Sequence, residues 1–399
     1  MPLQVLPAPR CIESIAVHKT VPLLLPRERE ATDPSLLDPV ENRKSGLSLN
    51  HIIGCPLNCA YCVRHLFGNF DMKMPKAIMS DEDAVARLTQ HPYFTPNVTP
   101  IQVFNRATDP FLPSVKEHTF QVLRLLANRG LTNHVLVITR FRVEPADAER
   151  LNEFAPLRVT LLVTYSGLDD ETIEPLGSDT AAASLKTAFD NARSFRTILY
   201  WRPLILGKND SDGHIDRAVS LSKTSHATVF TGLFFRDSIR EYYQEQGLPE
   251  PYTETARRKV LPKGLDARVT KEFAARGGGP LFRKTSCGVA FAHGVVDYNG
   301  HYGIRDICDI CPAVQVARCC AAFQQPTHEA VSRLARKVKT TSPFRIDEHA
   351  ITFDALDEQH RYHIQHTLGF QVHDSRHPHK CGRHGRADVG WEGQDRDDD

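Results

Sequence analysis

The sequence predicts an α/β protein built around a partial (β/α)6 barrel, and three observations support this prediction. Six aliphatic runs alternate with six helical patterns between residues 46 and 276. The runs lack polar alternation, as is typical of parallel strands that are buried on both faces. A loop with three cysteines follows the first run, and barrels collect their ligands at the carboxyl ends of their strands. The alternation alone also allows a doubly wound sheet, but the position of the cysteines favours the barrel.

The expected strands are short β-branched or aliphatic segments, with helical patterns between them. The strands are expected at 47–53, 101–104, 135–139, 159–164, 197–203 and 227–235. The first helix is expected to begin after Ser80, which precedes three acidic residues in the manner of an N-cap. The later helices are expected at 115–128, 145–154, 180–195, 212–223 and 238–246. Each helix thus follows one strand, as a series of βα units requires.

The chain is long enough for this barrel and several smaller parts. A run of three glycines, Gly277–Gly279, marks the end of the barrel. Residues after 373 are rich in His and Arg and then acidic, which is typical of a disordered tail. The expected parts are an irregular N-terminal lead-in at 1–45, the barrel at 46–276, a cysteine-rich region at 281–323, a small α+β piece at 326–372 and a disordered tail at 373–399.

The charge balance gives no general reason to expect binding to a nucleic-acid duplex. The chain has 49 Lys and Arg against 48 Asp and Glu, a formal net charge of +1, whereas duplex-binding proteins usually carry a basic excess. The N-terminus lacks a charged segment followed by an apolar run of signal-peptide length, and 21–25 is too short to span a bilayer. We therefore expect a cytoplasmic protein without membrane association, whose clustered cysteines serve metal or redox chemistry rather than disulfides.

Cys55, Cys59 and Cys62 are spaced C-x3-C-x2-C in one loop after the first expected strand. Three thiolates this close together can hold three corners of a soft-metal cluster. A [4Fe–4S] cluster normally takes four cysteines, and the next cysteine in the chain is Cys287. One iron would therefore stay open to a small molecule. The alternative is zinc on the same cysteines and His65, although structural zinc usually takes paired C-x2-C knuckles from two separate places.

With Tyr61 directly before its last cysteine, this loop resembles the signature of the radical S-adenosylmethionine (SAM) superfamily. The resemblance implies that SAM chelates the open iron of a [4Fe–4S] cluster through its amino and carboxylate groups. It also implies that an electron from the cluster cleaves SAM to methionine and a 5′-deoxyadenosyl radical, which abstracts hydrogen from a substrate. Such an enzyme takes its electron from a donor such as flavodoxin or ferredoxin.

Residues 46–236 also resemble the spore-photolyase-like branch of this superfamily, often labelled DNA-repair-photolyase-like. The matching pieces each follow an expected strand: Thr108-Asp109-Pro110-Phe111, Ile138-Thr139-Arg140, Leu168-Asp169 with Ile173-Glu174-Pro175, and Arg202-Pro203-Leu204-Ile205 with Asn209-Asp210. Spore photolyase has a cysteine a few tens of residues beyond the triplet that returns a hydrogen atom to thymine, and this chain has none there. The resemblance therefore does not imply the thymine-dimer reaction: either another donor such as a tyrosine serves, or the reaction differs.

The resemblance implies contacts to SAM from the ends of the expected strands. Arg140 matches the place of a basic residue that binds the SAM carboxylate, and a guanidinium offers a bidentate contact. Thr108 and Asp109 would accept from the SAM amine, where many radical SAM proteins use a Gly-Gly-Glu run. The other implied cofactor contacts are Tyr61, Thr164 with Ser166 as its substitute, and Asn209 at the ribose or adenine. The alternative for each polar residue is that it only caps a strand or helix.

A second group of cysteines follows the barrel and resembles a shortened auxiliary-cluster domain of radical SAM enzymes. The group consists of Cys287, Cys308, Cys311 and Cys319. Residues 294–302 predict a hairpin with an Asn-Gly turn that brings the flanking cysteines together. Four thiolates would fully ligate a second iron–sulfur cluster, with Cys320 as the spare. A four-cysteine zinc site and merely buried thiols are the alternatives.

The sequence leaves three functions open. The first is a radical SAM enzyme that abstracts hydrogen from a nucleic acid or nucleotide, which the branch resemblance favours. The second is a radical SAM tailoring enzyme for a small metabolite or ribosomal peptide, which the near-neutral charge and the second cysteine group favour. The third is a non-catalytic zinc protein that binds nucleic acid, and it predicts zinc, no iron and no affinity for SAM.

Overall fold

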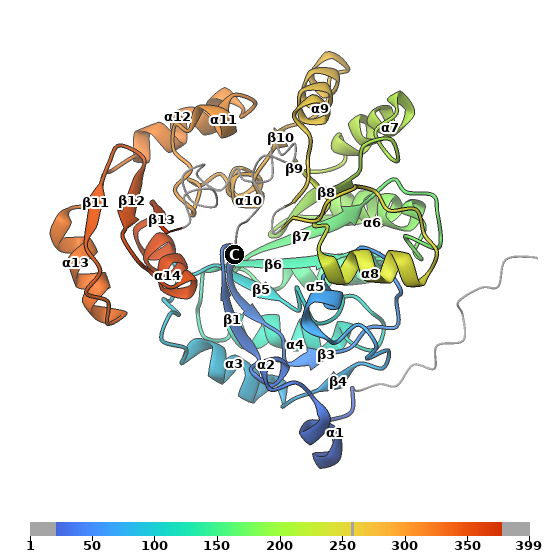
Figure 1. The fold of residues 1–399 in the computed structure, drawn as a ribbon, viewed down its shortest axis with the longest axis horizontal. Coiled ribbons are helices and arrows are strands. Elements are labelled where there is room, and N and C mark those ends of the chain that lie inside the picture. Colours follow the sequence, from blue (N-terminus) through green and yellow to red (C-terminus); the bar gives the residue numbers. More distant parts are fainter. Residues whose placement is uncertain (1–20, 257–258, 377–399) are drawn as a thin grey trace, which may run out of the picture.

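The structure, a computed structural model, describes residues 21–256 and 259–376. Its centre is one sheet with the strand order β1-β2-β5-β6-β7-β8-β9-β10 (Figure 1). Neighbouring strands are parallel except β1 and β2. The strands are β1 (Val40–Arg43), β2 (Gly46–Leu49), β5 (Ile101–Val103), β6 (His134–Thr139), β7 (Arg158–Tyr165), β8 (Arg196–Leu204), β9 (Ala227–Gly232) and β10 (Leu281–Phe282). The described edge strands β1 and β10 do not pair with each other, so the sheet is open, as expected of a partial barrel.

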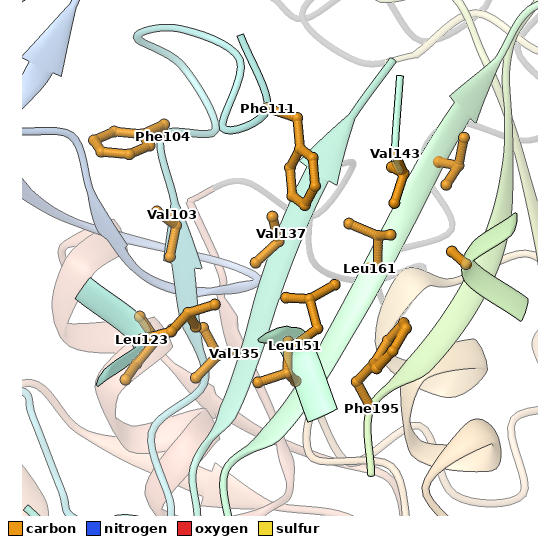
Figure 2. Close-up of a cluster of buried hydrophobic side chains, with 14 of the residues drawn as sticks. Val103, Phe104, Phe111, Leu123, Val135, Val137, Val143, Leu151, Leu161 and Phe195 are labelled. Carbon is orange, nitrogen blue, oxygen red and sulfur yellow. The ribbon is translucent and has the colours of Figure 1, made fainter. Parts of the chain in front are cut away.

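Helices that alternate with the strands cover one face of this sheet. They are α3 (Asp81–Thr89), α4 (Lys116–Ala127), α5 (Pro145–Asn152), α6 (Ser178–Asn191), α7 (Asp212–Ser222) and α9 (Lys263–Ala275). The helix α8 (Asp237–Glu245) packs instead on the loops at the carboxyl ends of the strands. Figure 2 shows Val137 of β6 and Leu161 of β7 on the side of Leu123 of α4 and Leu151 of α5. Burial of these apolar side chains is the main favourable contribution to folding. It also aligns the strands so that their carboxyl ends lie along one edge.

The second face of the sheet is covered by the cysteine-rich region. Ile198 and Tyr200 of β8 share a buried cluster with Cys287 and Val289 of α10 (Thr285–Ala292). Successive side chains of a strand point to opposite faces, and Trp201 accordingly lies in the core on the first face. Ile198 and Tyr200 therefore face α10, whereas an irregularity of β8 between Trp201 and Leu204 places Leu204 in the core on the first face.

The expected strands and their parallel order are confirmed, except that the strand expected at 47–53 is divided into β2 and β3 (Ile52–Ile53), which pairs in a separate sheet, and the strand expected at 227–235 ends at Gly232. Two short strands, β1 and β10, extend the large sheet. The lead-in expected to be irregular contains α1 (Pro26–Ala31), α2 (Pro34–Leu37) and β1, while residues 1–20 lie outside the described residues. β1 pairs with β2 across a tight turn that ends at Gly46. Gly46 has φ +121, and a Cβ there would lie 2.1 Å from the Pro100 carbonyl oxygen. The sequence did not indicate β1, because four residues of which two are charged give a weak pattern.

The hairpin expected at 294–302 is wrong, because these residues form turns and no strand. Side-chain bonds take the place of a strand ladder: Asp297 accepts from the backbone N–H of His301 at 2.8 Å. Gly300 has φ +73, and a Cβ there would lie 2.5 Å from the carbonyl oxygen of Gly369. The loop is therefore shaped by Asp297 and by its packing against the C-terminal part of the chain.

The C-terminal part is a small sheet, β11-β12-β13, with two helices. Its elements are α13 (His328–Lys337), β11 (Phe344–Ile346), β12 (Ala350–Phe353), α14 (Glu358–Leu368) and β13 (Gln371–Asp374). Asn42 of β1 donates to the Gln359 carbonyl oxygen of α14 at 2.8 Å, so this part contacts the edge of the large sheet (Figure 1, red). Residues 373–374, expected in the disordered tail, belong to β13, and 377–399 lie outside the described residues. No helix in the described ranges is long and apolar enough to cross a membrane.

Candidate metal and cofactor sites

The first cysteine loop lies between β3 (Ile52–Ile53), which pairs with β4 (Lys76–Ala77), and the 3-10 helix η1 (Val63–Phe67). Gly54 opens the loop with φ +105, and a Cβ there would lie 2.6 Å from the Met74 carbonyl oxygen. The backbone N–H of Cys55 donates to the Met72 oxygen at 2.8 Å. Only glycine allows so close an approach of two chain segments with this backbone conformation. The first cysteine is therefore fixed directly at the strand end.

Arg64 holds this loop from within the protein. It is buried and donates to the carbonyl oxygens of Cys55 (3.0 Å), Asn69 (2.8 Å) and Met72 (3.2 Å). The planar guanidinium suits this role because it presents several donors in fixed directions. Sequence reasoning did not identify Arg64, since nothing in its spacing distinguishes it from an exposed arginine.

The three cysteines line one open cavity at the carboxyl ends of β5 to β8. Its volume is about 620 Å³, including the space at its mouth. Cys55 and Cys59 are buried, and Cys62 is half-buried. Polar side chains reach this cavity from four successive strands or strand ends, namely Thr108, Arg140, Thr164 and Arg202. The first three were expected here, whereas Arg202 was not assigned to a site.

The sulfur positions do not fit the zinc alternative with His65. Among the described residues, the potential ligand atoms that lie within 4.8 Å of one another in a group of three or more are found elsewhere, not in this triplet. Tetrahedral zinc would bring its sulfurs within about 4 Å of one another. The His65 ring instead stacks on Phe70, with centroids 3.6 Å apart, and burial lowers its pKa to about 4. Three cysteines around a wider cavity suit a cluster, whose irons hold the sulfurs further apart.

The protonation of the Cys55 and Cys59 thiols depends on whether the cavity holds a metal. Burial raises the pKa of the Cys55 and Cys59 thiols, while the charges of Arg64 and Arg140 act in the opposite direction. A buried thiol ionises when a metal binds it, because the cation compensates the negative sulfur. The donor set therefore fits an iron–sulfur cluster.

Arg140 joins the cysteine loop to the loop after β7. Its Nη1 atom lies 2.7 Å and 2.9 Å from the two Glu174 carboxylate oxygens, 3.0 Å from the Tyr61 hydroxyl and 3.2 Å from the Cys59 sulfur. Tyr61 donates to the same carboxylate. Burial acts to raise the pKa of Glu174, but the guanidinium 2.7 Å away stabilises its charged form, so the two side chains form an ion pair. The structure places Tyr61 and Arg140 beside the cysteines. It also places Glu174 there, although the sequence did not indicate a role for Glu174 at the site.

Thr108 and Asp109 differ in what they offer to a ligand. The Asp109 carboxylate accepts from the Thr139 hydroxyl at 2.6 Å and from the backbone N–H groups of Phe111 at 2.9 Å and Arg140 at 3.0 Å. Burial raises the pKa of Asp109, and these bonds oppose that shift. The Thr108 hydroxyl is buried without a partner in the described chain and lines the cavity. Asp109 therefore holds together the chain segments that follow β5 and end β6. The hydroxyl of Thr108 is the one of these two groups that remains available to a ligand.

Two of the expected cofactor contacts serve the backbone instead. The Asn209 amide donates to the carbonyl oxygens of Ser166 at 2.6 Å and Pro203 at 2.7 Å, and its oxygen accepts from the Ile205 N–H at 2.8 Å. The Ser166 hydroxyl accepts from the Leu168 N–H at 3.1 Å. Neither residue lines the cavity, whereas Thr164 does. Asn209 differs from the expectation because the turn after β8 uses all of its hydrogen-bonding groups.

The second group of cysteines lines another cavity, of about 370 Å³, next to α10. Cys287 lies on α10, Cys308 ends α11 (Arg305–Cys308), Cys311 follows it, and Cys319 lies on α12 (Ala313–Ala322). All four line this cavity, and the exposed Cys320 does not. The turns at 294–302 thus bring the cysteines together without the expected hairpin.

Two polar side chains that sequence reasoning did not assign lie among these cysteines. The Nδ1 atom of His301 is 2.9 Å from Asp297 Oδ2 and 3.9 Å from the Cys287 sulfur. Together these three residues offer ligand atoms within 4.8 Å of one another. Burial raises the pKa of Cys287 and raises that of Cys308 to about 11. A bound cation would favour the thiolate form of these cysteines, and four sulfurs around one cavity fit a metal ion or cluster.

No family model matches the chain, and no curated protein matches it. Among solved structures, SuiB of Streptococcus suis bound to S-adenosylmethionine is 12% identical over 65% of this chain and 55% of its own, with a TM-score of 0.41. Spore photoproduct lyase complexed with dinucleoside spore photoproduct is 11% identical over 63% of this chain and 79% of its own, with a TM-score of 0.46. The chain is also similar to a point mutant of spore photoproduct lyase, at 10% identity over 63% of this chain and 79% of that one, with a TM-score of 0.48.

Proposed function

We propose that this chain is a radical SAM enzyme. Cys55, Cys59 and Cys62 would hold a [4Fe–4S] cluster, which supplies the electron that cleaves SAM to methionine and a 5′-deoxyadenosyl radical able to take hydrogen from a substrate. The observation that carries the proposal is the position of all three cysteines at one cavity, at the carboxyl ends of four strands. Ligands of α/β sheets bind along that edge.

The surrounding residues supply contacts suited to SAM. The contacts of Arg140 to Glu174, Tyr61 and Cys59 are made by Nη1, so Nε and Nη2 are available for a carboxylate. The buried hydroxyl of Thr108 can accept from an amine, since it has no partner in the described chain. Thr164 offers a second hydroxyl from β7. These groups would orient SAM and keep water from it.

We further propose that the second cavity holds a second iron–sulfur cluster on Cys287, Cys308, Cys311 and Cys319. The support is that all four cysteines line one cavity. Zinc is the competing ligand, since four thiolates bind it equally well. The iron content of the protein separates the two. Both cofactors would require a reducing, cytoplasmic setting and an electron donor such as flavodoxin or ferredoxin.

For the substrate, we propose a nucleic acid or a nucleotide, on the support of the matching pieces at the strand ends in the sequence. The second candidate is a small metabolite or a ribosomal peptide, which the second cysteine cavity favours. The zinc protein that binds nucleic acid is the least supported function, because it gives no role to Thr108 and Arg140, which line the same cavity as the three cysteines.

The test is anaerobic reconstitution of the full chain with iron and sulfide. We expect about four irons per cluster, and therefore about eight per chain if both cavities are filled. Incubation with SAM and a reductant should yield 5′-deoxyadenosine, and Cys55→Ser, Cys59→Ser and Cys62→Ser should each abolish it. A colourless protein without iron, or one that binds iron but never SAM, overturns the proposal.

A further inference from the structure

Four guanidinium groups line the first cavity, and three of them have partners of their own. Arg140 is paired with Glu174, with 2.7 Å between Nη1 and the nearer oxygen. Arg106 is paired with Glu41, with 3.1 Å between Nε and Oε2. Arg64 uses its donors on backbone carbonyl oxygens. The fourth, Arg202, is left without such a partner.

Arg202 lies near the end of β8, on the same face of the strand as Tyr200. Its guanidinium carbon is 4.0 Å from the centroid of the Tyr200 ring. The Tyr200 hydroxyl is in turn 3.1 Å from Oγ1 of Thr285, which holds the ring in place. Within the described part of the chain, no carboxylate, carbonyl oxygen or hydroxyl accepts a hydrogen bond from Arg202, although the residue is half-buried.

This arrangement prepares a guanidinium to receive a ligand. Stacking on an aromatic ring fixes the plane of the guanidinium and leaves its N–H groups free at the edge of that plane. Burial and the nearby charge of Arg140 lower the pKa of Arg202, which means that its positive charge is poorly compensated. A charge in a low-dielectric setting without a partner is costly, and a planar fork of donors matches two oxygens of one anion.

We propose that Arg202 binds an anionic group, a carboxylate or a phosphate, of a molecule held in the first cavity. The inference rests on the proposed function for the identity of that molecule, since the anion can be the carboxylate of SAM or an anionic group of the substrate. Two parallel hydrogen bonds from Arg202 would hold the anion at the carboxyl end of β8, where Arg202 lines the cavity. Arg202 would then add a second guanidinium contact to that of Arg140, which lies beside Cys59.

The test compares Arg202→Gln and Arg202→Lys with the wild type in anaerobically reconstituted full chain. Equilibrium dialysis measures the dissociation constants of SAM, of decarboxylated SAM and, in enzyme saturated with SAM, of inorganic phosphate. Loss of a charge-assisted contact should weaken binding about 10- to 100-fold for Gln. Arg202→Lys, which keeps the charge but not the fork, should weaken it less. Arg142→Gln is the matched control, because Arg142 is an arginine outside the cavity with a side chain 72% exposed.

The outcomes distinguish the two sources. If Arg202→Gln weakens SAM but not decarboxylated SAM, the anion is the SAM carboxylate. If it weakens phosphate and leaves SAM unchanged, the anion belongs to the substrate. The proposal is overturned if Arg202→Gln changes the dissociation constants of both SAM and phosphate by no more than about twofold. It is also overturned if the iron content falls in parallel with the affinity, because Arg202 would then be needed to keep the cluster bound. Should the wild type bind neither iron nor SAM, the proposed function fails, and the dissociation constant of phosphate, measured without SAM for the wild type and Arg202→Gln, still decides whether Arg202 binds an anion. Should Arg202→Gln fail to fold, the same comparisons are made with Arg202→Lys.

Discussion

The guanidinium of Arg140 lies 2.7 Å from the carboxylate of Glu174, and the same nitrogen lies 3.2 Å from the Cys59 sulfur. Both side chains are largely buried, with 18% and 5% of their surfaces exposed. The pair therefore links the loop after β7 to the cysteine loop at the point where a metal would sit. A carboxylate in this position balances the arginine and keeps it turned toward the sulfur.

Glu174→Gln should lower the free energy of unfolding by about 1–3 kcal/mol, because it leaves a buried guanidinium with a weaker, neutral partner. The variant should also bind SAM more weakly, since Arg140 loses the group that orients it. Urea denaturation and equilibrium dialysis measure the two effects. Glu144→Gln is the control, as Glu144 is 51% exposed and 3.8 Å from Arg142, and its loss should change little. Equal destabilisation by the two variants would contradict a structural role for the Arg140–Glu174 pair.

Thr108→Val should separate ligand binding from folding. The Thr108 hydroxyl is buried without a partner in the described residues, so its removal should leave the stability unchanged or raise it by up to about 1 kcal/mol. The affinity for SAM should fall several-fold if the hydroxyl accepts from the SAM amine. Thr139→Val is the matched variant, because the Thr139 hydroxyl has a buried partner: it donates to Asp109 at 2.6 Å. It should cost about 1–3 kcal/mol of stability. A destabilised Thr108→Val protein would show that the hydroxyl serves the fold.

The parts of the molecule that could be predicted from the sequence are those with local patterns. The apolar run before Cys55 and the spacing of the three cysteines lie within about fifteen residues, so one loop contains the whole signal. Strand ends with polar residues likewise predicted that Thr108, Arg140 and Thr164 would meet at one edge, and the structure places all three at the cavity.

The parts that could not be predicted depend on pairings between distant segments. Glu174 contacts Cys59 and Arg140 only because β7 and the cysteine loop end at the same edge. Asn209 has the residue type of a ligand contact, but a turn after β8 uses its amide. His301 lies beside Cys287 because its ring is hydrogen-bonded to Asp297, and both residues belong to a loop whose composition predicts a hairpin. Composition and spacing do not reveal which partner a polar side chain finds.

Cys308→Ser and Cys320→Ser test the second cavity as a matched pair. Both replace one sulfur by oxygen in neighbouring helices, but Cys308 lines the cavity and Cys320 is exposed outside it. After reconstitution, Cys308→Ser should lose about four irons per chain, whereas Cys320→Ser should retain the iron of the wild type. Colorimetric iron and sulfide determination checks this. If elemental analysis of the wild type finds one zinc ion per chain, the second cavity binds zinc and not a cluster. If both variants have the same iron content, Cys308 is not a ligand.

The stability of the protein should fall with acid in part because of two histidines with lowered pKa values, His134 on β6 and His293 at the end of α10. The rings of His134 and His293 lie 5.3 Å apart, and His293 Nε2 is 2.9 Å from the Thr160 hydroxyl. Burial lowers the pKa of each to about 3, whereas an unfolded histidine titrates near about 6.5. The unfolded chain therefore takes up protons first as the pH falls. The stabilisation is fully present above about pH 6.5 and is lost progressively between about 6.5 and 3.

Urea unfolding at pH 7, 6 and 5 should show this loss, with up to about 1.4 kcal/mol per pH unit from each histidine. His293→Gln removes one of the two sites and should make the decline with acid shallower by about that amount, although its stability at pH 7 is lower. His328→Gln is the control, because His328 is exposed and should leave the slope unchanged. Comparing variants at each pH cancels any common loss of iron in acid. If the free energy of unfolding falls with pH equally in His293→Gln and in the wild type, burial does not keep His293 neutral, and the prediction is wrong.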